Sequence, residues 1–232
     1  MILYSTDYAR IYQQMRDEKE QINYYILKNA KKVQKEFYYS QKLPCWIYKT
    51  ITLPKTNNTY LIYYYAMNRR ECDTGSCFIG SVLLLNDNEG RRWAIALRTF
   101  REIKKNLGII DSLQIFTGHF FSRYKERYPY MKDLPTLDLI ATFFGRNGGY
   151  FAELDYDELV LKKNRQENGS AWGVDDGITL GINSNTELPN GKLLYVTQHN
   201  TFISREMLKE NQASSVLSKE GMRAMCLNHF KE

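Results

Sequence analysis

Three features of this 232-residue sequence predict an α+β fold. The segment from Thr6 to Ser40 contains no Pro or Gly and repeats its apolar residues at helical intervals. A block rich in β-branched and aromatic residues follows it, and a second group of short strand-like runs comes late in the chain. Because helices and strands occupy separate stretches of sequence, we expect them to form separate layers.

The N-terminal segment is expected to form one long amphipathic helix from Thr6 to Ser40. Thr6 or Asp7 can cap its first turn, and many Lys, Glu and Gln residues predict that one face meets solvent. A helix of this kind is most often structural, and it can also hold two copies of a chain together. A homodimer is therefore one alternative that the sequence leaves open.

Pro44 interrupts the helical pattern, and an antiparallel meander of four strands is expected after it. The turn-forming sequences PKTNN at 54–58 and NDNEG at 86–90 separate the two members of each hairpin. A short helical or connecting segment is expected at Arg101–Leu107. The predicted strands are Trp46–Leu53, Thr59–Met67, Cys77–Leu85 and Arg92–Thr99.

The second half of the chain is expected to hold central helices, further strands and a C-terminal helix. Thr117 is the candidate N-cap of a helix at Gly118–Tyr128, and a shorter helix is expected at Leu134–Phe144. Residues 1–110 and 111–232 then form either two units or one continuous domain. The late strands are expected at Ala171–Val174, Gly177–Ile182, Leu193–Thr197 and Thr201–Ser204, before a helix from Glu206 to His229.

The composition suits a protein that binds a polyanion. The formal charge is +6, the pI is near 9.0, and 18 Tyr and 11 Phe residues provide rings that can stack on bases. Apolar runs such as Val82–Leu85 are too short to span a bilayer, and the N-terminus lacks the pattern of a signal peptide. Of the four cysteines only Cys72 and Cys77 lie close together, so we expect a reduced, cytoplasmic protein with no metal and no cofactor. RNA is the expected partner, rather than a membrane.

The central helix is the strongest candidate for chemistry. His119, Arg123 and Arg127 recur every four residues and so lie in one stripe on a helix face. An imidazole beside two guanidiniums suits phosphodiester chemistry without a metal, because it combines a proton-transfer group with fixed positive charge. A neighbouring stripe is aromatic and is expected to anchor the helix: Phe116, Phe120, Tyr124 and Tyr128.

Further residues are expected to assist or to bind the substrate. His199 is interpreted as a turn residue at a loop tip, which becomes a second acid, base or ligand contact if the fold brings it to the central helix. Arg146, in a Gly-rich setting, and Tyr124 complete the expected substrate-binding set. The competing interpretation is structural, because a lone histidine has many uses and Arg123 can pair with Glu126 on an exposed helix face.

Two short motifs resemble a known group of nucleases. HFxxRYxxR begins at His119, and TFISREML spans Thr201–Leu208. Over Gln114–Leu208 the chain is similar to the metal-independent ribonucleases and toxins of the barnase, EndoU, colicin and RelE-like group. The resemblance implies a helix packed on a small antiparallel sheet, with the site on the sheet face. It implies the following roles: His119 as the helix histidine, Arg123 and Arg127 as phosphate-binding arginines, and Thr201 or Ser204 as a late hydroxyl.

The function expected from these features is that of a toxin-like, metal-independent endoribonuclease. On this hypothesis His119 moves the 2′-OH proton, the two arginines hold the phosphate, and a late hydroxyl or His199 assists. The N-terminal region would position RNA or bind a neutralising protein partner. Two alternatives stand beside it: a non-catalytic nucleic-acid-binding module, and a protein-interaction module held as a dimer by its N-terminal helix.

Overall fold

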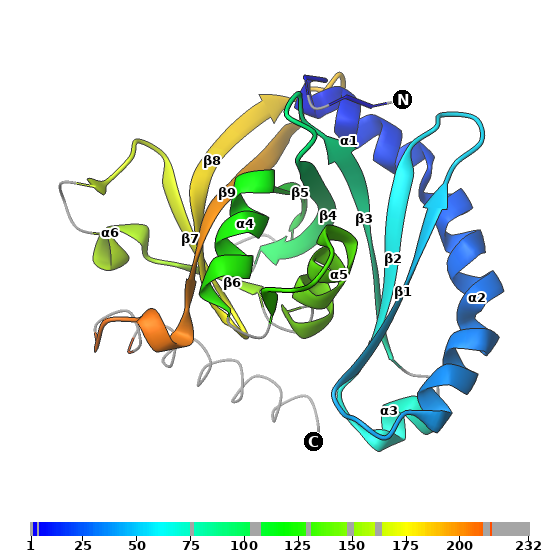
Figure 1. Ribbon diagram of the computed structural model, residues 1–232. Helices are drawn as coiled ribbons and strands as arrows, with labels where there is room; N and C mark the ends of the chain where they lie inside the picture. Colours follow the sequence, from blue (N-terminus) through cyan, green and yellow to red (C-terminus); the bar gives the residue numbers. More distant parts are fainter. Residues whose placement is uncertain are drawn as a thin grey trace.

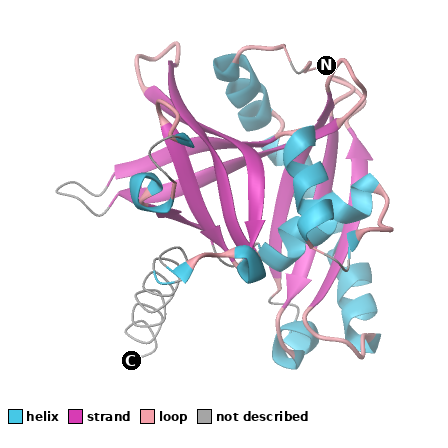
Figure 2. Ribbon diagram, turned by 60° about the vertical axis from the view of Figure 1, so that its left-hand side comes forward, coloured by secondary structure: helices cyan, strands magenta, loops and turns pink. Residues whose placement is uncertain are grey.

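The computed structural model describes residues 2–3, 5–74, 77–102, 108–128, 131–147, 151–160, 164–210 and 214. These residues form a nine-stranded mixed sheet with helices on both faces, so the fold is α+β (Figures 1 and 2). The strand order is β1-β2-β3-β4-β5-β9-β8-β7-β6, in which β5 and β9 run parallel. The strands are β1 (Cys45–Thr52), β2 (Thr59–Ala66), β3 (Phe78–Asn86), β4 (Arg92–Glu102), β5 (Gly108–Phe116), β6 (Phe151–Leu154), β7 (Gly169–Val174), β8 (Gly177–Glu187) and β9 (Leu193–Ser204).

The N-terminal segment forms two helices, α1 (Tyr8–Asp17) and α2 (Lys19–Tyr39), which cover one face of the sheet (Figure 1). Asp7 caps α1, as the sequence predicts. The prediction of one continuous helix is wrong at Glu18, a buried residue that separates the two helices. Its carboxylate accepts hydrogen bonds from Asn58 Nδ2 at 2.8 Å and from the Tyr60 hydroxyl at 2.5 Å. These tertiary contacts fix the junction against the β1–β2 hairpin.

The four predicted strands of the meander are confirmed as β1 to β4. β4 continues past its predicted end to Glu102, and the rest of the expected connecting segment lies outside the described residues. β5 was not predicted at all. Leu113 and Ile115 of β5 pack into one core, whereas Ser112 and Gln114 point to the opposite face. Alternation of this kind normally marks a strand with one face in solvent, but here the polar Ser112 and Gln114 are buried as well.

The late strands differ more from the prediction. β9 runs unbroken, so His199 lies inside the sheet and not at a loop tip. β9 pairs with β5 on one side and with β8 on the other, and a β-bulge interrupts the β8 register at Leu180/Gly181. The sequence predicts a turn at Gln198–Asn200, but the backbone of this strand is hydrogen-bonded to its neighbours β5 and β8. β6 and the short helix α6 (Tyr156–Leu159) were also not predicted.

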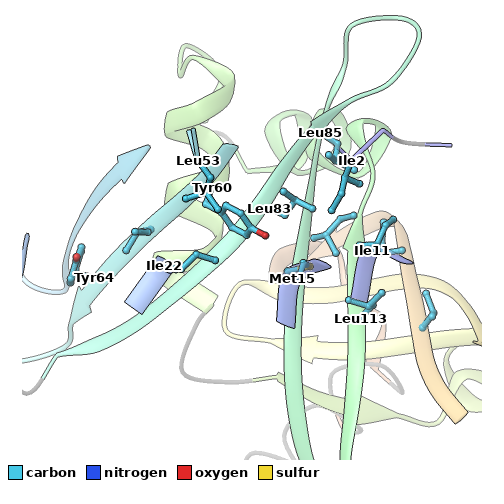
Figure 3. Close-up of a cluster of buried hydrophobic side chains, with 14 of the residues drawn as sticks. Ile2, Ile11, Met15, Ile22, Leu53, Tyr60, Tyr64, Leu83, Leu85 and Leu113 are labelled. Atoms are coloured by element: carbon cyan, nitrogen blue, oxygen red, sulfur yellow. The ribbon is translucent and has the colours of Figure 1, made fainter. Parts of the chain in front are cut away.

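The central helices α4 (Gly118–Arg127) and α5 (Thr136–Asn147) cover the face of the sheet opposite to α1 and α2 (Figure 2). Successive side chains of β2 point to opposite faces of the sheet. Tyr60 and Tyr64 pack beneath α1 and α2 (Figure 3), whereas Leu61 and Tyr63 pack beneath α4 and α5. The sheet is therefore buried on two sides along these strands, and α4 is held between the sheet and solvent.

The described part of the chain reaches a 3-10 turn, Arg205–Met207, directly after β9. The predicted helix from Glu206 to His229 lies largely outside the described residues. Among the helices that the structure describes, none has both the length and the apolar composition needed to cross a bilayer.

Candidate nucleic-acid interface

Helix α4 is fixed at its start and along its inner face, as the sequence predicts. Thr117 caps the helix, and its hydroxyl oxygen accepts from the Phe120 amide at 3.1 Å. Phe116, Phe120 and Tyr124 are buried, and Tyr128 is half-buried. The Phe120 and Tyr124 rings stack at a centroid distance of 6.5 Å. This aromatic anchor orients the other flank of the helix away from the core.

The flank of α4 away from this anchor carries His119, Arg123 and Arg127, which we call the outer stripe. His119 is exposed, and Arg123 Nε donates to His119 Nε2 at 3.4 Å. Arg123 also pairs with Glu126 at 2.7 Å, with both side chains largely in water. An exposed pair of this kind contributes little to stability, so the guanidinium remains open to exchange with another anion.

Arg127 joins α4 to β9. Its guanidinium donates to the Phe202 carbonyl and to Thr201 Oγ1, the latter at 3.4 Å. Thr201 is half-buried beside it, so the structure brings one expected late hydroxyl to the outer stripe. Ser204, the other expected hydroxyl, is buried near the end of β9.

Two further candidates, Tyr124 and Arg146, meet at a residue that the sequence did not single out. Asp176 is only 4% exposed. Its carboxylate accepts from the Tyr124 hydroxyl at 2.7 Å, from Arg146 Nη2 at 2.6 Å and from Asn147 Nδ2 at 2.9 Å. The Arg146 guanidinium also lies over the Tyr128 ring, 4.9 Å from its centroid. We call this the Asp176 network.

In the Asp176 network the polar groups of Tyr124 and Arg146 already have hydrogen-bond partners. Burial, together with the negative charge of Asp176, raises the pKa of Tyr124 well above its ordinary value. Burial alone lowers the pKa of Arg146, but its bonds to Asp176 outweigh that effect and raise the pKa. Both side chains therefore hold their protons, and their polar atoms connect α4 and α5 to the β7–β8 turn. The network is suited to structure more than to substrate binding.

His199 occupies a second buried network. It has no exposed surface, and its ring stacks on Phe116 at 4.4 Å. Nδ1 lies 2.9 Å from Thr179 Oγ1, and Nε2 lies 2.8 Å from Gln114 Oε1. Because the Gln114 amide donates to Ser112 Oγ at 2.8 Å, its oxygen faces the imidazole and accepts the Nε2 proton.

The environment of His199 keeps the imidazole neutral. Burial, reinforced by the positive charge of Arg98, lowers its pKa from 6.5 to about 3. Both ring nitrogens have partners, and the ring does not reach solvent. His199 thus holds β5, β8 and β9 together, and His119 is the candidate histidine that faces water.

Sequence reasoning missed both Asp176 and Gln114. Asp176 lies in the sequence Asp175-Asp176-Gly177, where aspartate is common for backbone reasons alone. No local signal distinguishes the buried aspartate from its half-exposed neighbour. Gln114 has no signal either, because its role depends on a strand that lies more than eighty residues away in the chain.

A pocket of about 560 Å³ lies on the other flank of α4. The α4 residues Phe121, Ser122 and Lys125 form one side, and the start of α5, the β3–β4 turn and Tyr48 of β1 complete the lining. Its charges are mixed, since Arg92 and Lys125 face a lining that also contains Asp138. In the described ranges no three His, Cys, Asp or Glu side chains are grouped so that they could hold a metal ion.

Comparisons of the chain with protein-family models, curated proteins and solved structures found no match. The interpretation of the site therefore rests on its own geometry.

Proposed function

We propose that this chain binds RNA through the outer stripe of α4. The observation that carries the proposal is the arrangement of His119, Arg123 and Arg127 on one flank of a rigidly anchored helix, with His119 exposed and both arginines partly exposed. Among the described residues, the partners of Arg123 are the exposed His119 and Glu126, so a phosphate can replace the Glu126 carboxylate without leaving a buried group unpaired. The net charge of +6 favours a polyanion, and a cytoplasmic RNA is the partner class we propose.

Two substitutions with opposite expected effects test this surface. Arg123→Gln removes one phosphate contact and should weaken binding of a fluorescent single-stranded RNA about fivefold at 0.1 M salt. Glu126→Gln removes the carboxylate that competes for Arg123 and should strengthen binding about two- to fivefold. Fluorescence anisotropy measures both, with Lys192→Gln in the exposed β8–β9 turn as the control. If the two variants and the control bind equally, RNA does not contact the outer stripe.

Metal-independent cleavage of RNA is a second candidate function, and the His119–Arg123 contact favours it. Arginine is only a donor, so the bond from Arg123 makes His119 Nε2 the acceptor, and in a neutral ring Nδ1 then carries the proton. When the Arg123 guanidinium turns to a phosphate, the lone pair of Nε2 is released next to a fixed positive charge, and Nε2 can act as a base. In the proposed step Nε2 takes the 2′-OH proton, the 2′ oxygen attacks phosphorus, and the 5′ oxygen leaves with a proton from water. Arg127 and Thr201 lie beyond Arg123 on the same side of the helix.

Cleavage is tested with a mixed RNA pool in EDTA, using the wild-type protein beside His119→Ala. We expect cleavage by the wild type and at least a hundredfold slower cleavage by the variant, because general acid–base catalysis contributes on this scale. His119 is exposed, so the melting temperature of the variant should not change. Equal rates for both proteins would assign the activity to another site or to a contaminant, and the outer stripe would then bind RNA without cleaving it.

A further inference from the structure

Helix α2 presents a second surface that the proposed function does not use. Lys19–Tyr39 forms a helix of about 31 Å on the face of the sheet opposite to α4 (Figures 1 and 2). Ile22, Val33 and Phe37 bury its inner face against the sheet. The exposed side chains from Tyr24 onward, which we call the α2 outer face, are Tyr24, Leu27, Lys28, Lys31, Lys32, Gln34, Lys35, Tyr38 and Tyr39; the acidic Glu20 is exposed one turn before them.

The α2 outer face carries positive charge along most of its length. From Gln21 to Lys35 the sequence contains no acidic residue. Glu36 follows, but it is half-buried at the side of the helix and pairs with Lys49 on β1 at 3.6 Å. The four outward lysines form no ion pair with any other described residue. Spaced three or four residues apart, they stand about 5–6 Å from one another in a row of mutually repelling charges. Such a row is stabilised when it meets a polyanion.

Aromatic rings flank these lysines at both ends of the helix. The exposed fractions of Tyr24, Tyr38 and Tyr39 are 60%, 58% and 69%. The backbone beneath Tyr38 is fixed, because Arg69 Nη2 donates to the Tyr38 carbonyl at 2.6 Å at the end of the helix. Rings that remain in solvent on a rigid element are available to stack on bases.

We propose that the α2 outer face is a docking surface for single-stranded RNA, with lysines on phosphates and tyrosines on bases. The inference rests on the proposed RNA-binding function and adds a separate surface to it. A row of cations with exposed aromatic rings at its ends suits single-stranded nucleic acid, because every base offers a face for stacking and every linkage offers a charge.

Two other occupants fit the face less well. A second copy of the chain, packed through the same helix, would place lysines opposite lysines, and the like charges would oppose association. An anionic membrane favours a helix that inserts a continuous aliphatic strip, whereas Leu27 is the one aliphatic residue among the side chains of the α2 outer face.

The test compares Lys31→Gln/Lys35→Gln with Lys55→Gln/Lys192→Gln, a control pair of exposed lysines outside α2. Affinity for a fluorescent single-stranded RNA is measured between 50 and 200 mM salt. Each lysine that contacts a phosphate adds about 0.7 to the slope of log K against log salt, so the α2 pair should lower the slope by about 1.4. At 0.1 M salt this corresponds to binding about 25-fold weaker. The control pair should behave as the wild type.

Each possible result either supports or contradicts RNA docking on the α2 outer face. If the α2 pair and the control pair bind alike while Arg123→Gln binds weakly, the docking surface is overturned and the α4 proposal stands. A wild type that does not bind RNA overturns both. Loss of binding to phosphatidylserine vesicles without loss of RNA binding would instead identify a membrane surface. A dimer in the wild type that dissociates in the α2 pair would identify a self-association surface.

Discussion

Asp176→Ala is expected to destabilise the fold by about 3–5 kcal/mol, one of the two largest effects that we predict. The substitution removes the acceptor of Tyr124, Arg146 and Asn147 at once. It leaves a half-buried guanidinium without its carboxylate and a buried phenol without its acceptor. Both groups then carry an uncompensated desolvation cost. Urea denaturation followed by far-UV circular dichroism measures the loss.

Asp157 provides a matched control, because it also pairs with an arginine. The Arg165–Asp157 pair is 3.3 Å long and its carboxylate side chain is 70% exposed. Asp157→Ala should therefore cost no more than about 1 kcal/mol. If Asp176→Ala costs as little as this control, the Asp176 network does not hold the central helices to the sheet. Its arginine would then have to be reconsidered as a residue that binds a ligand.

The stability of the protein is expected to fall by about 2 kcal/mol between pH 6.5 and pH 5 because of His199. The pKa of His199 is lowered to about 3 in the folded protein, while the ordinary value is 6.5. The unfolded chain therefore takes up a proton in this range and the folded chain does not. This contribution to stability is complete above pH 6.5 and is lost as the pH falls toward 3. The expected slope is about 1.4 kcal/mol per pH unit.

The measurement is urea denaturation at several pH values from 7.5 to 5, above the range in which most carboxyl groups titrate. His199→Gln removes the titrating group and should flatten the dependence, although it lowers stability at neutral pH. His119→Ala serves as the control, because His119 is exposed and should leave the slope unchanged. A wild-type stability that does not change from pH 6.5 to 5 would contradict a neutral, buried His199.

Local signals were sufficient for the strands β1 to β4 and for α4. The strands β1 to β4 are separated by strong turn sequences, and their β-branched and aromatic residues leave few other conformations open. Thr117 and the aromatic stripe predicted where α4 begins and which side it buries. These features depend on neighbours within a few residues, and such neighbours are visible in a sequence.

Tertiary pairing decided the features that the sequence did not reveal. β5 and β9 carry buried polar residues that are stable inside the protein because Gln114 of β5 and Thr179 of β8 both bond to the His199 ring of β9. Likewise, Glu18 separates α1 from α2 because a hairpin forty residues later supplies its hydrogen-bond partners.

In the candidate site, too, some features were visible in the sequence and others depended on the tertiary structure. Helical spacing placed His119, Arg123 and Arg127 on one flank, which is a local property of the helix. Whether the other candidates faced solvent depended on distant partners: Asp176 holds Tyr124 and Arg146, and Gln114 holds His199. The sequence by itself determined residue type and spacing, and only the tertiary structure determined burial. The physical reason is that the partners of a buried polar group are chosen by the fold and not by its neighbours in the chain.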